Sequence, residues 1–208
     1  MEQIFEESLR VLKQDAYFRP LIKKYGPPDL TTYHKTETTA FSALLRSIIY
    51  QQLSGRAAGA IYARVLDLFP HETPTPADLL KIRKPSLRKA GLSIAKIDYV
   101  RDLARKCLDG TIDEMRFPQM SSQEIIDHVT QVHGIGEWTA HMLLIFTLYR
   151  SDVLPVGDLA IRKGFQKLYN MKSLPTKKEM QTRAMPWASH ASIASWYLWK
   201  LVDEDASV

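Results

Sequence analysis

Two short stretches carry the residue types from which chemistry could be built. The first is VHGIGEWTA, residues 132–140, where Gly134 and Gly136 form a tight turn before a helical pattern. Glycine allows positive φ and close backbone approach, and the free N–H groups that open a helix carry partial positive charge. Such a turn can bind a phosphate without a side-chain cation. The alternative is an ordinary turn between two helices.

The second stretch is LPVGDLAIRKGF, residues 154–165, in which Asp158 precedes an apolar helical pattern. Aspartate is among the best N-cap residues, and this structural role alone could explain its position. Capping N–H groups also favour the ionised form of the carboxyl group. Asp158 is therefore expected to cap a helix and to be charged at neutral pH, and a catalytic role is compatible with the structural one.

The elements that must position these residues are helices. Apolar residues recur with helical spacing, and no convincing β alternation or internal repeat is present. Glycine and proline residues break the pattern into short segments. The fold class is therefore expected to be all-α. Helices are predicted at residues 2–14, 37–50, 56–69, 77–82, 86–90, 93–108, 122–131, 137–149, 159–169, 176–184 and 190–203.

Composition narrows the classes of function. The net charge of +5 favours a polyanionic partner. The single cysteine, Cys107, excludes a disulfide framework, a cysteine-based zinc site and a four-cysteine iron–sulfur cluster, and it suits a reducing compartment. His133, His141 and His190 lack metal-ligand spacing. No apolar run reaches membrane-spanning length, so no membrane partner is expected.

Four segments together resemble the HhH-GPD superfamily of DNA glycosylases. VHGIGEWTA resembles its helix-hairpin-helix motif, and LPVGDLAIRKGF resembles the loop and catalytic aspartate that follow the motif. FSALLRSIIYQQLSGRAAGAIYARV, residues 41–65, resembles the loop between two helices that enters DNA. SIASWYLWK, residues 192–200, resembles the C-terminal helix. The order of the segments is that of the family, and the most similar branch is that of the alkylbase (3-methyladenine) DNA glycosylases.

The resemblance implies a single HhH-GPD domain over residues 1–208, with two helical lobes flanking a DNA-binding cleft. One lobe is expected at about residues 41–140, and the other at about 1–40 plus 141–208. The resemblance also implies that Asp158 stabilises the positive charge on the sugar as the N-glycosidic bond breaks, and that it directs the attacking water. Many relatives carry Asp or Asn where this chain has Gly157, and arginine where it has Ala191.

The resemblance further predicts how the base is bound and released. Bifunctional members carry a lysine at the position of Trp138, so this chain is expected to be monofunctional, using water and leaving an abasic site. Trp138, Trp199 and Tyr50 are expected to stack on a flipped base, with core packing as the alternative for each. N-alkylated purines suit such a pocket because they are cationic or electron-poor.

Three sets of DNA- and ion-binding residues follow from the same resemblance. Gln52, Leu53 and Ser54 are expected to fill the gap left by the flipped nucleotide, with a capped turn as the alternative. DNA phosphate is expected at Gly134, Ile135, Gly136 and Thr139. A structural Na⁺ or K⁺ is expected at the backbone carbonyls of Thr130, Val132 and Ile135, and no other cofactor is required.

A run of positive charge adds a candidate DNA-backbone surface. Such runs are usually solvated helix faces, and a subset of this one is predicted to contact phosphates. The run comprises Lys81, Arg83, Lys84, Arg88, Lys89, Lys96, Arg101, Arg105 and Lys106.

The sequence as a whole predicts an intracellular, monomeric hydrolase. Its expected activity is the excision of alkylated purines of the 3-methyladenine and 7-methylguanine type, and its expected partner is double-stranded DNA with a damaged base. Three alternatives stay open: a non-catalytic protein that binds abasic or distorted DNA, a glycosylase for another base, and a helical enzyme acting on small molecules.

Overall fold

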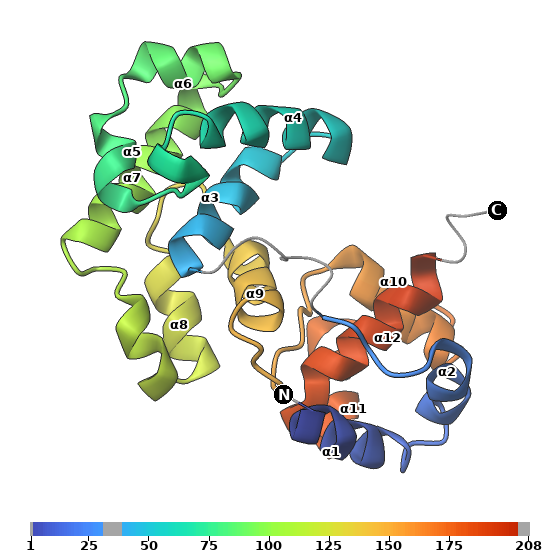
Figure 1. The fold of residues 1–208 in the computed structure, drawn as a ribbon. Coiled ribbons are helices and arrows are strands. Elements are labelled where there is room, and N and C mark those ends of the chain that lie inside the picture. The colour runs from blue at the N-terminus through green and yellow to red at the C-terminus, as the bar shows by residue number, and fades with distance from the viewer. Residues whose placement is uncertain (1, 31–38, 204–208) are drawn as a thin grey trace. The chain divides into compact units, whose positions relative to one another are not determined.

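The computed structural model describes residues 2–30 and 39–203, and within these residues it contains helices and no strand (Figure 1). This confirms the all-α class expected from the sequence. The described residues fall into two compact units. Unit 1 comprises those within 1–33 and 144–208, and unit 2 those within 34–143. No helix among the described residues is long and apolar enough to cross a membrane.

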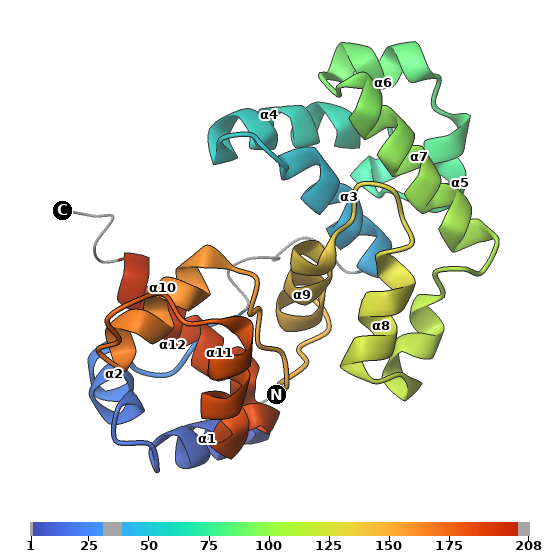
Figure 2. The ribbon, with the colours of Figure 1, turned by 180° about the vertical axis from the view of Figure 1, so that it is seen from behind.

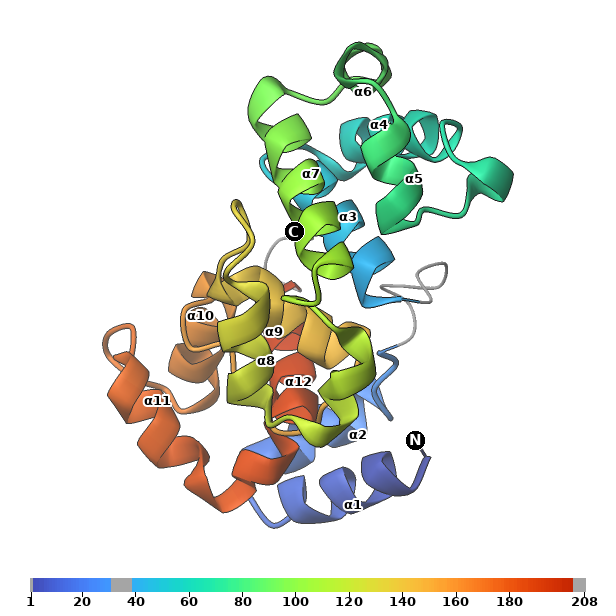
Figure 3. The ribbon, with the colours of Figure 1, turned by 90° about the vertical axis from the view of Figure 1, so that its left-hand side faces the viewer.

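Unit 2 is built around the longest of its helices, α7 (Ile94–Leu108), which packs against its neighbours α3, α5 and α6 (Figure 3). Serine and threonine N-caps begin most of its helices, as they do in proteins generally. The remaining elements are α3 (Ala40–Tyr50), α4 (Gly55–Leu66), η2 (Pro70–Glu72), α5 (Pro76–Lys81), α6 (Lys84–Ala90), η3 (Glu114–Gln119) and α8 (Ser122–Val129). Helix α9 (Glu137–Phe146) begins in unit 2 and ends in unit 1.

Unit 1 surrounds α12 (Ala191–Asp203), which contacts α1 (Glu2–Leu12), α2 (Phe18–Tyr25) and α10 (Leu159–Leu168) (Figure 2). The other two elements are α11 (Lys177–Ala184) and η4 (Met185–His190). Helices α10 and α12 approach closely at Gly164, where a Cβ atom would lie 2.9 Å from both Cβ and the carbonyl oxygen of Leu198. Glycine at this position therefore sets the spacing between the helix that follows Asp158 and the helix that carries Trp199.

The observed helices differ from the predicted ones at several boundaries, and three of the differences are the clearest. Helix α2 was not predicted, because it has only eight residues and contains Pro20, which a helix tolerates in its first turn. Helix α9 ends at Phe146 rather than at residue 149, and Tyr149 takes the left-handed conformation with a φ of 52°. The predicted start at residue 37 lies outside the described residues, and α3 begins at Ala40 after the cap Thr39.

The only cysteine of the sequence lies near the end of α7. Cys107 is partly buried, and this burial, with Glu114 and Asp109 nearby, raises the pKa of its thiol to about 12. The thiol is therefore neutral at physiological pH.

Candidate functional site

The hairpin turn, residues 130–136, connects α8 to α9 in unit 2 (Figure 3). Gly134 has a φ of 84°, and a Cβ atom there would lie 2.3 Å from the ring of Tyr99. Glycine is thus required both by the backbone conformation and by the contact with Tyr99. The turn closes with a hydrogen bond from the Ile135 N–H to the Val132 carbonyl, 3.0 Å.

The start of α9 offers backbone N–H groups as possible phosphate donors. The first helical hydrogen bond runs from the Ala140 N–H to the Gly136 carbonyl, 3.1 Å, and the N–H groups before it belong to the first turn, which has no intrahelical acceptors. The side chains of Ile135 and Thr139 are buried, at 5% and 4% exposure.

Helix α7 supports the hairpin turn with a charged group as well as with Tyr99. The Asp102 carboxylate accepts the backbone N–H of His133 at 2.9 Å and lies 3.1 Å from both the His133 Nδ1 and the Lys106 Nζ. Burial opposes ionisation of Asp102, yet the His133 N–H and Lys106 outweigh it and hold the pKa of Asp102 below its usual value. The turn is thus anchored to α7 through an ionised carboxylate.

The wedge loop, residues 50–54, connects α3 to α4 and exposes an apolar side chain. Gln52 takes the left-handed conformation with a φ of 58°, which is uncommon for a residue other than glycine. Leu53 is 40% exposed, and Ser54 caps α4 by accepting the Ala57 N–H at 3.4 Å. Ser54 is therefore engaged as a cap, while Gln52 and Leu53 lie at the surface as the insertion hypothesis requires.

The aspartate loop, residues 150–158, precedes α10 in unit 1. The Asp158 carboxylate accepts the Ile161 N–H at 2.9 Å, which makes Asp158 the N-cap predicted from the sequence. The side chain is half-buried. The neighbouring Gly157 is exposed, with open space where a side chain would begin.

Ser192 of α12 ties the aspartate loop to the core of unit 1. Its Oγ donates to the Arg150 carbonyl at 2.6 Å and accepts the Val153 N–H at 3.1 Å, while its own N–H donates to the Ser151 carbonyl at 2.9 Å. Ser195, one turn further, donates chiefly to the Ala191 carbonyl, 2.8 Å. Ser192 is completely buried. Three hydrogen bonds at one residue therefore fix the path of the chain toward Asp158.

The candidate base-stacking residues differ in how much of each ring is available. Trp138 lies in the first turn of α9 and is 53% exposed. Trp199 is half-buried and stacks on Phe146, with ring centroids 5.7 Å apart. One face of Tyr50 is covered by the Arg46 guanidinium, 4.0 Å from the ring centroid. Of the three rings, that of Trp138 is the most accessible.

Most of the basic run is engaged inside unit 2. Lys81, Lys84 and Lys106 form ion pairs with Asp78, Asp98 and Asp102. Arg88, Lys96, Arg101 and Arg105 donate to backbone carbonyls. Seven of the nine residues therefore have partners within this unit, and the exposed pairs at Lys81 and Lys84 contribute little to its stability. Among the described residues, no group of three or more His, Cys, Asp and Glu side chains could hold a metal ion.

Comparison with known proteins decides the family. The sequence profile of the HhH-GPD superfamily base excision DNA repair proteins matches residues 45–190. The chain belongs to this superfamily. This HhH-GPD protein is 36% identical over 162 residues to DNA-3-methyladenine glycosylase 1 of Schizosaccharomyces pombe, covering 77% of this chain and 71% of that protein. It is 27% identical to the alkylbase DNA glycosidase-like protein mag2 of the same organism, covering 90% and 88%.

Two solved structures share the fold of the HhH-GPD protein over nearly its whole length. DNA-3-methyladenine glycosidase from Bacillus halodurans has a TM-score of 0.85 and 34% identity, covering 95% of this chain and 89% of that one. Mag1 of S. pombe in complex with abasic DNA has a TM-score of 0.77 and 33% identity, covering 94% and 95%. These proteins are relatives of this chain.

Sequence reasoning did not assign roles to several residues that support the site. Gln51 and Lys96 hold the wedge loop, Tyr99 and Asp102 hold the hairpin turn, and Ser192 holds the aspartate loop. The signal in the sequence is weak, since a lysine in a basic run or a serine in a helix is common. Only the small residues of ASIAS at the start of α12 indicate that another segment packs closely there.

Proposed function

We propose that this protein is a monofunctional DNA glycosylase that excises alkylated purines of the 3-methyladenine and 7-methylguanine type. The observation that carries the proposal is Asp158, a carboxylate held by the Ile161 N–H in a loop that Ser192 fixes to α12. These hydrogen bonds fix the position of the Asp158 carboxylate. Preorganised negative charge is what a sugar cation needs in a transition state.

The proposed reaction is hydrolysis of the N-glycosidic bond by water. The bond between C1′ and the base nitrogen breaks, and the electron pair leaves with the base. An N-alkylated purine that carries a positive charge departs as a neutral base. Water adds to C1′, and the proton that it loses passes to Asp158 or to solvent. Asp158 thus stabilises the developing cation and orients the nucleophile.

We propose that the protein has no lyase activity, because Trp138 stands where a lyase would carry its reactive lysine. A lyase needs an amine that attacks C1′ and forms an imine, and an indole ring offers no such group. The exposed Trp138 ring instead provides a π-face for an electron-poor base, and Trp199 provides a second aromatic group. Mixing the protein with abasic DNA and borohydride should therefore trap no covalent adduct, and recovery of an adduct would contradict this assignment.

The partner that we propose is double-stranded DNA containing a damaged base, bound by a monomer. The backbone N–H groups at the start of α9 suit a phosphate oxygen, and the exposed Leu53 suits the gap that a flipped nucleotide leaves. These contacts are sequence-independent, as expected for a protein that must find rare lesions in any sequence.

We also propose a monovalent cation at the hairpin turn, held by the carbonyls of Thr130, Val132 and Ile135. The chemistry of the donors fits, because Thr130 ends α8 and the C-terminal carbonyls of a helix carry partial negative charge. The Val132 carbonyl accepts the Ile135 N–H and retains a second lone pair. Affinity for abasic DNA should be higher in K⁺ or Na⁺ than in choline at equal ionic strength, and equal affinities would contradict the site.

Free-base release tests the proposed activity directly. Duplex DNA containing 7-methylguanine or 3-methyladenine is incubated with the protein, and released base is quantified by chromatography. Asp158→Asn should lower the rate by about 10²- to 10⁴-fold while retaining the helix cap and binding to abasic DNA. Asp113→Asn is the matched control, because Asp113 is also a capping aspartate, at the start of η3.

Two outcomes would contradict the proposal. Equal release by Asp158→Asn and the wild-type protein would remove Asp158 from the mechanism. No release by the wild type, together with tight abasic-DNA binding by both proteins, would favour the alternative of a non-catalytic protein that binds damaged DNA.

A further inference from the structure

We propose that Lys96 and Gln51 form a brace that fixes the wedge loop and joins it to the hairpin turn, so that the two DNA-contacting segments move as one. The inference rests on the proposed function, in which the wedge loop enters DNA and the hairpin turn binds phosphate. It assigns positioning roles to two residues that do not themselves have to touch DNA.

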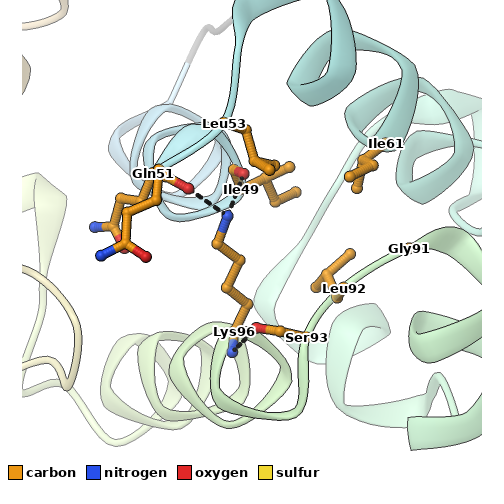
Figure 4. Close-up of a pocket in the computed structure, with 9 residues that line it drawn as sticks. Ile49, Gln51, Leu53, Ile61, Gly91, Leu92, Ser93 and Lys96 are labelled. Carbon is orange, nitrogen blue, oxygen red and sulfur yellow. Dashed lines mark hydrogen bonds between the residues drawn. The ribbon is translucent and has the colours of Figure 1, made fainter.

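The first half of the brace is Lys96, which reaches from the first turn of α7 to the end of α3. Its Nζ donates to the carbonyl oxygens of Ile49 and Gln51, each at 2.7 Å (Figure 4). The last carbonyls of a helix have no intrahelical donor and carry partial negative charge, so an ammonium group there both satisfies and stabilises them. Partial burial lowers the pKa of Lys96, in keeping with an ammonium group turned away from water.

The second half of the brace is the Gln51 side chain. Its Nε2 donates to the carbonyl oxygen of Gly134 at 2.8 Å. Gly134 is the residue of the hairpin turn that Tyr99 holds in place. Lys96 thus fixes the backbone of Gln51, and Gln51 connects that backbone to the hairpin turn 83 residues away in the sequence.

The wedge loop needs such support because little packs against its inner side. A pocket of about 210 Å³ lies there, and its lining includes Leu53, Ile61 and Leu92 (Figure 4). Gln52 also holds a left-handed conformation that costs free energy unless the surroundings impose it. The Leu53 N–H donates to the Tyr50 carbonyl at 3.3 Å within the loop, and the hydrogen bonds of the brace add the contacts that hold the loop from outside.

The competing role for Lys96 is a direct contact to a DNA phosphate. Both roles predict weaker binding when Lys96 is removed, but they differ in their response to salt. Loss of a phosphate contact lowers the slope of log affinity against log salt by about 0.9, whereas loss of a positioning group leaves the slope unchanged. Salt dependence therefore separates the two roles.

The test measures the affinity of the full chain for abasic duplex DNA over a range of salt concentrations. Lys96→Met keeps the aliphatic chain and should weaken binding on the order of tenfold with an unchanged salt slope. Lys178→Met, at an exposed site in α11, removes the same charge and should change neither value. A reduced slope for Lys96→Met, or affinity equal to wild type, would overturn the brace. Thermal unfolding checks that each variant is folded.

A second variant covers the case in which Lys96→Met does not fold. Gln51→Leu removes only the hydrogen bond to Gly134 and should also weaken abasic-DNA binding without changing the salt slope. In the double variant, the combined loss should be smaller than the product of the two single losses, because either change already disconnects the loop from the turn. Fully multiplicative losses would show independent roles and would overturn the brace.

Failure of the brace is distinguishable from failure of the proposed activity. Base release by the wild type is scored separately from abasic-DNA binding. Release of 7-methylguanine, with equal behaviour of wild type and Lys96→Met, would overturn the brace and leave the glycosylase intact. No release, with the predicted loss of binding in Lys96→Met, would overturn the glycosylase and support the brace. No binding of abasic DNA by the wild type would overturn both.

Discussion

The wedge loop of unit 2 and the aspartate loop of unit 1 are held by different means. The wedge loop is held by long polar side chains, Lys96 and Gln51, next to an open pocket, and it exposes Leu53. The aspartate loop is held by the buried hydroxyl group of Ser192 against α12. The first arrangement suits a segment that must present an apolar side chain to a large ligand, and the second suits a group that must not move.

This difference predicts that DNA binding and base release can be changed separately in the proposed glycosylase. Changes near the wedge loop and hairpin turn should act mainly on DNA affinity. Changes near the aspartate loop should act mainly on the rate of base release. The four substitutions below test that separation.

The largest effect on stability is expected from Gly134→Ala. The new Cβ would overlap the ring of Tyr99, and the φ of 84° disfavours any side chain. Urea unfolding should show a loss of about 2–4 kcal/mol, and abasic-DNA affinity should fall because the turn is displaced. Gly136→Ala is the control, since a Cβ atom there meets open space. Equal behaviour of the two variants would contradict the role of Tyr99.

The next effect is that of Ser192→Ala, which leaves the Val153 N–H and the Arg150 carbonyl without their shared partner. The free energy of unfolding should fall by about 1–3 kcal/mol. Base release should slow on the order of tenfold, while abasic-DNA affinity stays within about twofold, since small displacements of a catalytic group reduce rate. Ser195→Ala should have a smaller effect on rate. A loss of affinity equal to the loss of rate would break the separation.

A pH-dependent effect is expected from Asp102→Asn. The pKa of Asp102 is depressed in the folded protein, so its contribution to stability is present above the unfolded-state value of 3.8 and is lost as the pH falls through the folded-state value. At pH 7 the variant should be less stable by about 1 kcal/mol. The difference from wild type should shrink as the pH falls below about 4. If the difference in unfolding free energy between wild type and Asp102→Asn grew as the pH fell, the inferred depression of the Asp102 pKa would be contradicted.

The smallest effect on stability belongs to Leu53→Ala, because this side chain is already 40% exposed. Unfolding free energy should change by less than about 1 kcal/mol, whereas abasic-DNA affinity should fall on the order of tenfold as the gap in the base stack is left open. Leu108→Ala, at another exposed leucine, should leave affinity unchanged. Unchanged affinity in Leu53→Ala would remove the wedge assignment.

Local signals made part of the molecule predictable. Helical periodicity gave the all-α class, and Asp158 before an apolar helical pattern correctly predicted an N-cap. The glycine turn before α9 was predictable because glycine tolerates positive φ, and Gly134 does adopt a positive φ. Each of these features depends on a few neighbouring residues, so each leaves a pattern in the sequence.

The supporting contacts were not predictable, because they join segments far apart in the chain. Along the chain, the two carbonyls that accept from the Lys96 Nζ lie 45 and 47 residues from Lys96. The two residues that hydrogen-bond to the Ser192 Oγ lie 39 and 42 residues from Ser192. A carbonyl acceptor has no side-chain identity, so no residue type marks the receiving position. The basic run at residues 81–106 was also hard to interpret from sequence, because the number of charges does not distinguish a lysine that binds within the protein from one that binds DNA.

A glycosylase of the proposed kind would work where alkylating agents are present, so the reactivity of the partly buried Cys107 thiol matters. Electrophiles that methylate purines also attack thiolates, and a modified cysteine would add bulk to α7, the helix that supports the two segments for which we propose DNA contacts. Burial, with Glu114 and Asp109 nearby, raises the pKa of this thiol to about 12, so it stays protonated at neutral pH. The repair protein that we propose thus carries no readily alkylated cysteine of its own, and it should keep its activity in the chemical conditions that create its substrates.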